Sequence, residues 1–266
     1  ISEDGVLEGI AEEISKMELK TVFFLVSIQI LLWTVQAFAW RETISGLSYK
    51  PPTFLRSISH LAALFIGKYI PGKVWGMTAR GGDLVLSGIS TQATIKITLY
   101  EQMLIVFAAT LVFVVGASVS RELLLPSLLF AIISSFFLSA FFRISTNLAR
   151  RVLQIFSKGN STAVLPNGKP AKNSWFLQWI TSLHIVAWAL QGLIAVLLAQ
   201  GIGLTIDGNI ANIIAAHAAS SLLGFVAVFA PGGFGVREAS FITLLENSFE
   251  LHSIAAVAVM LRMWTI

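Results

Sequence analysis

Long runs of apolar residues dominate the chain, and polar positions fall mainly between them. A helix needs about 20 mostly apolar residues to cross a lipid bilayer. Runs of this kind predict membrane-spanning helices at residues 21–40, 93–116, 123–142, 176–200 and 254–266, the last of them incomplete. The pattern therefore predicts an all-α integral membrane protein, a polytopic bundle of helices.

Two further apolar segments each run into a proline–glycine pair, at Pro71 and at Pro231. Proline removes a backbone donor and clashes with the preceding helical turn, and glycine adopts dihedral angles that are closed to other residues. We therefore expect the segments at residues 54–74 and 210–230 to break at these prolines. Each should then continue as a short second helix, at residues 76–87 and 236–248.

The two broken segments occupy matching places in two halves of the chain. The string SIQILLWTVQ, which begins at Ser27, aligns with SLHIVAWALQ, which begins at Ser182. A histidine and then a proline–glycine break follow each string, and the offset between matching positions drifts only from 155 to 157 to 160. We expect one transmembrane domain over residues 1–266, made of repeats at residues 19–142 and 175–266 around a loop at residues 143–174.

The basic residues predict how the spans are oriented. If both broken segments are re-entrant helix pairs, entering and leaving by the same face, residues 41–91 and 143–174 share one side with twelve Lys and Arg residues. The opposite side then holds four. Because cations near span ends favour the cytoplasmic side, we expect the first side to be cytoplasmic and the two repeats to be inverted. Full crossings by the broken segments would make the repeats parallel instead.

Composition agrees with this class and excludes several kinds of function. Hydrophobic residues make up 56% of the chain and charged residues 12%, against about 25% charged in ordinary globular proteins. With no cysteine, disulfides, thiolate metal sites and cysteine nucleophiles are excluded. No zinc-binding histidine spacing or phosphate-binding loop is present, so we expect neither a metal nor a cofactor.

The net charge of +4 is explained by basic loops between apolar spans, and we expect no nucleic acid partner. The chain starts at Ile1 and stops at Ile266 inside an apolar run, so we expect further helices beyond both ends.

Two strings resemble the signatures of a known family. LFIGKYIPGKVWGMTARGGDL surrounds the first break, and APGGFGVREASFITLL surrounds the second. Both resemble the flippase-like family built on the transmembrane region of lysylphosphatidylglycerol synthase, which is also the membrane half of the bacterial multiple peptide resistance factor. The resemblance runs from about residue 19 to residue 266. Glu101 and the string RMWT, which begins at Arg262, also stand where this family carries such residues.

The resemblance implies a domain of the prokaryotic cytoplasmic (inner) membrane that moves a lipid with a charged or phosphate-containing headgroup between leaflets. Its expected partners are membrane lipids: an anionic or aminoacylated phospholipid, or a polyprenyl-phosphate-linked headgroup. A homo-oligomer is compatible with the sequence.

A helix that breaks inside the membrane exposes backbone donors and a partial positive charge at its new N-terminus, where a phosphate can bind. Ionisable residues inside membrane segments are costly to bury and indicate function. We expect the following residues to bind the substrate: Pro71, Gly72, Lys73, Arg80, Glu101, Pro231, Gly232, Gly233, Gly235, Arg237, Glu238 and Arg262. The basic members would face a headgroup phosphate. The acidic members, with Asp83, would balance them or contact a cationic headgroup.

Each of these residues also has a structural interpretation. The breaks could be hinges or packing points, and each charged residue could belong to an ion pair between helices. Lys73, Arg80 and Asp83 could lie on a solvated cytoplasmic face. For His60 and His217, which fall at equivalent repeat positions, hydrogen bonds to neighbouring helices are favoured over a proton relay.

Two other functions stay open at this stage. One is a membrane-embedded enzyme acting on a lipid-linked substrate, with Glu101 or Glu238 as general base. The other is a non-catalytic membrane scaffold for a lipid-modifying partner. A scaffold should tolerate substitution of the charged residues at the breaks, whereas a transporter should not.

Overall fold

The computed structural model describes residues 17–70, 74–119, 174–227 and 229–265. Within these ranges the chain forms eight α-helices and a short 3-10 turn, which confirms the predicted all-α class. The predicted span at residues 123–142 and nearly all of the predicted loop at residues 143–174 lie outside the described residues.

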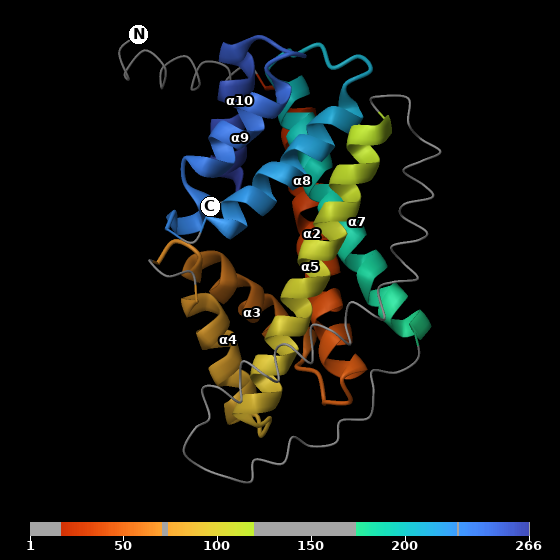
Figure 1. Cartoon of the computed structure of the whole chain (residues 1–266), viewed down its shortest axis with the longest axis vertical. Helices are drawn as coiled ribbons and strands as arrows, with labels where there is room; N and C mark the ends of the chain where they lie inside the picture. The colour runs from red at the N-terminus through yellow and green to blue at the C-terminus, as the bar shows by residue number, and fades with distance from the viewer. Residues whose placement is uncertain (1–16, 71–73, 120–173, 228, 266) are drawn as a thin grey trace.

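Among the described helices, three are long and apolar enough to cross a membrane: α2 (Leu19–Gly46), α5 (Thr91–Val119) and α7 (Ser174–Gly201). They contain the predicted spans at residues 21–40, 93–116 and 176–200 and extend beyond each one. Large apolar side chains point outward from them, such as Phe23 of α2, which is 68% exposed. Such an apolar surface suits lipid surroundings. Figure 1 shows these helices running along the length of the molecule.

The first broken segment forms a helical hairpin of α3 (Phe54–Gly67) and α4 (Trp75–Leu86), which pack against each other. A β-carbon added to Gly67 would lie 2.2 Å from the backbone nitrogen of Gly76, so only glycine permits this approach. The first helix ends before the predicted break at Pro71, since α3 stops at Gly67. A proline ring clashes with the carbonyl four residues earlier, and that residue is Gly67 for Pro71.

The second broken segment forms a matching hairpin of α8 (Ile210–Val226) and α9 (Val236–Leu245), joined through the 3-10 turn η1 (Pro231–Gly233). A β-carbon on Gly233 would lie 3.0 Å from the α-carbon of Gly224, so a glycine pair again lies between the two arms. Gly232 has φ 58°, a conformation that glycine adopts without strain. The helix α8 ends before the predicted residue 230, because Pro231 disrupts the turn before it.

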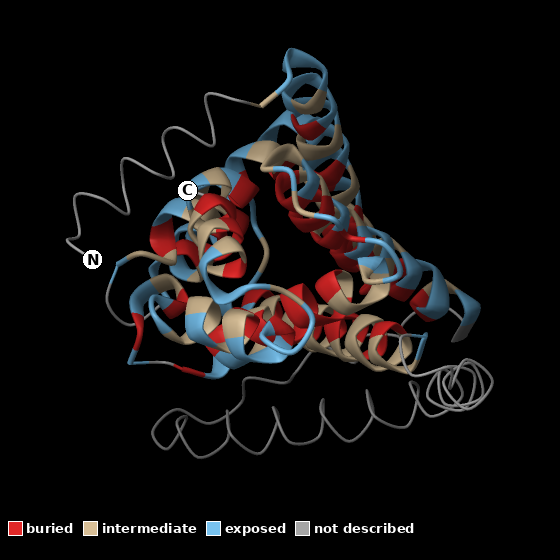
Figure 2. Cartoon of the chain, turned by 90° about the horizontal axis from the view of Figure 1, so that it is seen from above, coloured by how far each residue is buried: buried red, intermediate tan, exposed pale blue. Residues whose placement is uncertain are grey.

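The last described helix, α10 (Leu251–Trp264), packs against α9 and α7. The largest core cluster joins α2, α7, α8, α9 and α10 through apolar side chains such as Leu25, Ile194 and Leu261. Viewed from above, buried residues concentrate where helices face one another, and exposed residues cover the outer faces (Figure 2).

The two hairpins approach each other from opposite ends of the molecule. In Figure 1, α3 and α4 lie in the lower half, α8 and α9 lie in the upper half, and the ends where each chain reverses meet at mid-height. The backbone nitrogen of Gly232 donates a hydrogen bond to the carbonyl of Lys68 at 2.7 Å. Two breaks that lie about 160 residues apart in the sequence are therefore in direct contact.

Candidate functional site

The contact between the hairpin tips, together with the end of α10, forms what we call the hairpin junction: Lys68, Tyr69, Gly232, Arg237, Glu238, Arg262 and Thr265. Lys68 caps the C-terminus of α3, and its ammonium group donates to the carbonyl of Thr265 at 3.0 Å. The hydroxyl of Tyr69 approaches the same carbonyl at 3.5 Å. Residues from three separate parts of the chain thus meet within a few ångströms.

Arg262 and Glu238 hold the glycine turn in place. Nη1 of Arg262 lies 3.1 Å from Oε1 of Glu238 and donates to the carbonyl of Gly232 at 3.2 Å. Oε2 of Glu238 accepts from the backbone nitrogen of Gly235 at 2.8 Å, at the start of α9. The guanidinium of Arg262 also lies 5.2 Å from the ring of Tyr69, within the range of a cation–π interaction. The predicted ion pair between helices is therefore present at this place.

Arg237 is the third basic residue of the junction, and among the described residues it forms no ion pair. Its β-carbon packs near Gly224, and its Nη2 atom is buried with no hydrogen-bond partner among the described residues. Lys68, Arg237 and Arg262 lie close enough to repel one another. Against these three cations the described part of the junction offers one carboxylate, that of Glu238. The junction therefore carries excess positive charge in a partly buried place.

A second charged group lies between the first hairpin and the long helices. Arg80 of α4 and Glu101 of α5 are 1% and 3% exposed and form two hydrogen bonds, one of them 3.1 Å long between Nη1 and Oε1. The guanidinium of Arg80 stacks on the ring of Trp40, with Cζ 3.7 Å from its centroid. The interpretation of Arg80 as part of a solvated face is wrong, because α4 turns this residue toward α2 and α5. The alternative of a structural ion pair describes it.

Trp40 connects this pair to a polar network nearer the surface. Its indole nitrogen donates to Nδ1 of His60 at 3.0 Å, and Nε2 of His60 lies 2.7 Å from a carboxylate oxygen of Asp83. Arg56 donates to the other oxygen of Asp83 at 2.6 Å, and this hydrogen bond lowers the pKa of the Asp83 carboxyl. Two neighbours, Arg56 and His60, thus keep Asp83 paired at a place where its side chain is 33% exposed.

The two histidines at equivalent repeat positions behave differently. The predicted hydrogen bonding to a neighbouring helix is confirmed for His60. It is wrong for His217 within the described residues, because both ring nitrogens are buried without a hydrogen-bond partner. The ring of His217 instead packs against Trp188, with centroids 6.2 Å apart.

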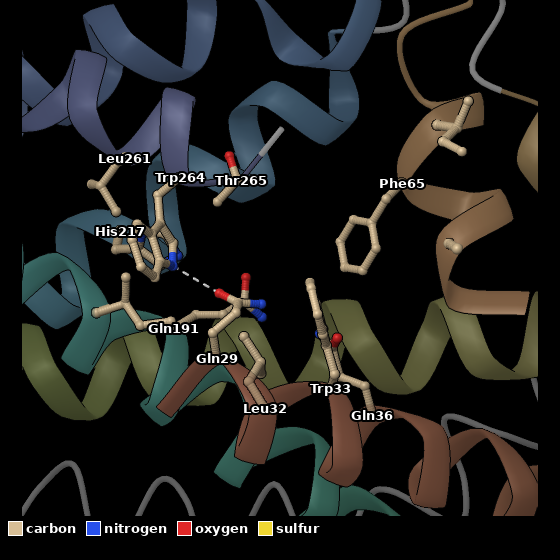
Figure 3. A pocket seen from close by; sticks show the side chains of 13 residues that line it. Gln29, Leu32, Trp33, Gln36, Phe65, Gln191, His217, Leu261, Trp264 and Thr265 are labelled. Atoms are coloured by element: carbon tan, nitrogen blue, oxygen red, sulfur yellow. Dashed lines mark hydrogen bonds between the residues drawn. The ribbon is translucent and has the colours of Figure 1, made fainter. Parts of the chain in front are cut away.

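Two adjoining cavities open beside the junction. The larger, about 310 Å³, lies between the first hairpin and helices α2, α5, α7 and α8, and its polar lining consists of Gln36, Lys68, Glu101, Gln102, His184, Gln191 and Ser221. The smaller, about 220 Å³, is lined by Gln29, Gln36, Gln191, His217 and Thr265, with the rings of Trp33, Phe65 and Trp264 (Figure 3). They share Gln36, Phe65 and Gln191 and together fall in the range of small-molecule sites, about 300–1,000 Å³.

His217 also borders a narrow hollow that is formed with Arg237, Glu238 and Arg262. Basic residues of the junction therefore lie beside both cavities. Lys68 lines the larger cavity, and Arg237 and Arg262 share the narrow hollow with His217, which lines the smaller cavity.

The structure brings together part of the predicted substrate-binding set. Gly232, Arg237, Glu238 and Arg262 lie in the junction. Arg80 and Glu101 form a separate pair, of which Glu101 lines the larger cavity. The predicted Pro71, Gly72 and Lys73 lie outside the described residues.

Lys68 and His184 are among the cavity residues that the sequence interpretation missed. Lys68 stands three residues before the first proline–glycine break, and that position was a usable signal. His184 sits within a mainly apolar span, where only the packing of neighbouring helices reveals that it is 5% exposed. Nothing in the sequence around it distinguishes a cavity side from a lipid side.

Comparison with known proteins places these features within one family. A family model described as the lysylphosphatidylglycerol synthase transmembrane region matches residues 6–266. The match covers both hairpins, the junction and the cavities. No curated protein matches the chain significantly.

Proposed function

The chain belongs to the family of the lysylphosphatidylglycerol synthase transmembrane region, and from that premise we propose that it moves a lipid between membrane leaflets. In this proposal the phosphate of the headgroup binds at the hairpin junction, and the rest of the headgroup occupies the two cavities. The proposal rests on the excess positive charge of the junction. Among its described residues, the three cations Lys68, Arg237 and Arg262 lie near one carboxylate, that of Glu238. A buried cation without a counterion is unfavourable, so an anionic group would stabilise this arrangement.

The repeat supports a transport mechanism. Inverted repeats with interrupted helices are common in transporters, and the substrate binds near the midplane where the breaks meet. Four pairs of matching residues differ by the same 157 positions: His60/His217, Gly67/Gly224, Gly76/Gly233 and Arg80/Arg237. Both hairpins use the glycines of this set for the contact between their arms. We propose that both hairpins are re-entrant and that the two repeats are inverted.

The charge distribution supports a place and an orientation in the membrane. We propose that the protein resides in the prokaryotic cytoplasmic membrane, with the basic residues 143–174 on the cytoplasmic side. Irregular backbone is tolerated at membrane depth only where protein or a cavity surrounds it. The contacts of the glycine turn with Lys68 and Arg262 meet that condition.

Transport accounts for the two interior carboxylates better than catalysis does. A general base needs a free oxygen within hydrogen-bonding reach of its substrate. Both oxygens of Glu101 accept from Arg80, and those of Glu238 face Arg262 and Gly235. Both carboxylates therefore already have hydrogen-bond partners within the described residues.

The test is lipid movement in liposomes that contain the purified protein and a fluorescent phosphatidylglycerol. A reducing agent that cannot cross the membrane bleaches the outer leaflet, so the later loss of signal reports movement from the inner leaflet. We expect the variants Lys68→Ala and Arg237→Ala to move the lipid at least about tenfold more slowly, equivalent to about 1.4 kcal/mol in the barrier.

Arg56→Ala is the matched control, because it removes a cation from the surface network and leaves the junction intact. It should retain the rate of the unmodified protein. Equal rates for Arg237→Ala, Lys68→Ala and the unmodified protein, at equal amounts of folded protein, would rule the junction out as the phosphate site. That result would favour a scaffold.

A further inference from the structure

The lining of the two cavities carries an unusual number of unpaired polar atoms. Among the described residues, the buried side-chain atoms without a hydrogen-bond partner include Oε1 of Gln36, Nε2 of His184, both ring nitrogens of His217 and Oγ of Ser221. All four residues line one cavity or both. Buried polar groups in folded proteins nearly always have a partner. Such a concentration indicates a ligand that forms several hydrogen bonds.

These unpaired atoms belong to neutral groups. Gln29, Gln36 and Gln191 supply primary amides to the smaller cavity, and His217 is 1% exposed beside them. Figure 3 shows Gln29 and Gln191 pointing into this cavity, with Trp33 and Trp264 on either side. The indole nitrogen of Trp264 donates to Oε1 of Gln29 at 2.9 Å, which holds that amide in one orientation.

Among the described residues, no free carboxylate lines either cavity. Glu101 is the one carboxylate that lines either cavity among the described residues, and Arg80 occupies both of its oxygens. The described lining of the cavities therefore offers no unpaired carboxylate to an ammonium group.

Hydrogen-bonding capacity then decides between two classes of headgroup. A primary amide has two donors and an acceptor, and a hydroxyl group both donates and accepts, so the two are complementary. An ammonium group has three donors, no acceptor and a full charge that must be paired when it leaves water. The amides and imidazoles of the cavities can form hydrogen bonds with several hydroxyl groups. They supply no negative charge to pair with an ammonium group.

We infer that the transported lipid carries, beyond its phosphate, an uncharged polyhydroxyl group such as a glycerol, an inositol or a sugar, and that the cavities disfavour a cationic aminoacyl headgroup. This inference rests on the proposed function, since it assigns the cavities to the same lipid whose phosphate binds at the junction. Lys68 belongs to the junction and also lines the larger cavity. One lipid could therefore place its phosphate at the junction and its hydroxyl groups against the polar side chains of the cavities.

The experiment compares three fluorescent lipids in the same liposomes: phosphatidylinositol, phosphatidylglycerol and lysylphosphatidylglycerol. We expect the first two to move at least about tenfold faster than the lysyl lipid. Equal or faster movement of the lysyl lipid would overturn the inference and leave the proposed function standing. Movement of none of the three above protein-free liposomes would refute the proposed function itself, so the two failures are distinguishable.

The variant Gln191→Glu sharpens the test by placing a carboxylate in both cavities. It should slow phosphatidylinositol at least about fivefold and speed the lysyl lipid, so that the preference narrows or reverses. Gln200→Glu is the matched control, with the same substitution on the same helix at an exposed position. It should keep the original ratio of rates.

If Gln191→Glu does not fold, Gln191→Ala is measured instead. This smaller change should slow phosphatidylinositol more than the lysyl lipid. A ratio of rates that stays the same in a folded Gln191 variant shows that the headgroup does not use these amides, and the inference fails.

Discussion

The two helical hairpins share a plan and differ in how their matching arginines are treated. Each hairpin has a glycine pair between its arms and an arginine at the same repeat position, Arg80 in α4 and Arg237 in α9. Arg80 is neutralised by Glu101 and covered by Trp40. Arg237 has a buried Nη2 atom with no partner among the described residues. The first hairpin has the features of an anchor, and the second has those of a binding arm.

The difference shows how a duplicated unit can take on two tasks. In a buried ion pair with good geometry, the attraction between the charges offsets the free-energy cost of removing them from water. A single buried charge without its partner is strongly destabilising. The first hairpin can therefore be fixed permanently against α2 and α5. In the proposed mechanism, the positive charge of Arg237 in the second hairpin is neutralised by the phosphate of the bound lipid. Lipid binding then depends on the position of the second hairpin.

The largest expected effect comes from removing the two arginines separately. Arg80→Ala leaves Glu101 as an isolated buried carboxylate and should lower the free energy of unfolding by about 3–5 kcal/mol. Arg237→Ala removes a cation whose Nη2 atom has no hydrogen-bond partner among the described residues, so the free energy of unfolding should stay within about 1 kcal/mol of that of the unmodified protein. Thermal and denaturant unfolding in detergent would measure both.

The double variant Arg80→Met with Glu101→Leu serves as the control, because apolar residues of similar volume often replace a buried pair without loss. It should recover most of the stability that Arg80→Ala loses. Equal destabilisation by Arg80→Ala and Arg237→Ala would contradict the division into an anchor and a binding arm.

The glycine pairs provide a smaller effect. In Gly67→Ala the new β-carbon would lie 2.2 Å from the backbone of Gly76, and overpacking of this kind lowers stability by about 1–3 kcal/mol. In Gly224→Ala it would lie 3.2 Å from the β-carbon of Arg237, a side-chain atom, and the higher helix propensity of alanine, about 1 kcal/mol, offsets that contact. Unfolding of the two variants side by side measures the difference. A greater loss for Gly224→Ala would show that the second hairpin is the more tightly packed one.

The smallest effect is expected at the surface of the first hairpin. Arg56 is 44% exposed and pairs with Asp83, which His60 also contacts. Exposed pairs contribute little and are screened by salt. Arg56→Ala should therefore shift the unfolding midpoint less than Gly67→Ala does, and raising the salt concentration should shrink the shift further. A shift as large as that of Arg80→Ala would show that the surface network, and not the buried pair, fixes this hairpin.

Much of the fold could be predicted from the sequence because membrane helices leave a strong pattern. Long apolar runs placed α2, α5 and α7 to within a few residues, apart from the C-terminal end of α2. That helix continues past Trp40 because Trp40 and Ile44 are fully buried against other helices. The proline–glycine pairs located both hairpins, although each first helix ends before its proline, since the ring disrupts the preceding turn.

The candidate site was only partly predictable. The glycine turn and the basic residues beside it were identifiable, because a proline–glycine pair interrupts a helix and an arginine within an apolar segment is rare and costly. Which carboxylate would meet which cation was not identifiable. Arg80 pairs with Glu101 on another helix, and Arg262 pairs with Glu238 across 24 positions of the chain.

By itself, then, the sequence determined the membrane class, the helices and the places where they break, because these follow from local hydrophobicity and backbone geometry. Tertiary structure alone decided that Lys68 and Gly232 touch, that Arg80 is neutralised and Arg237 is not, and that three glutamines face a shared cavity. The physical reason is that side-chain charge and hydrogen bonding are satisfied between helices, and the sequence of one helix does not specify which face of another it will meet.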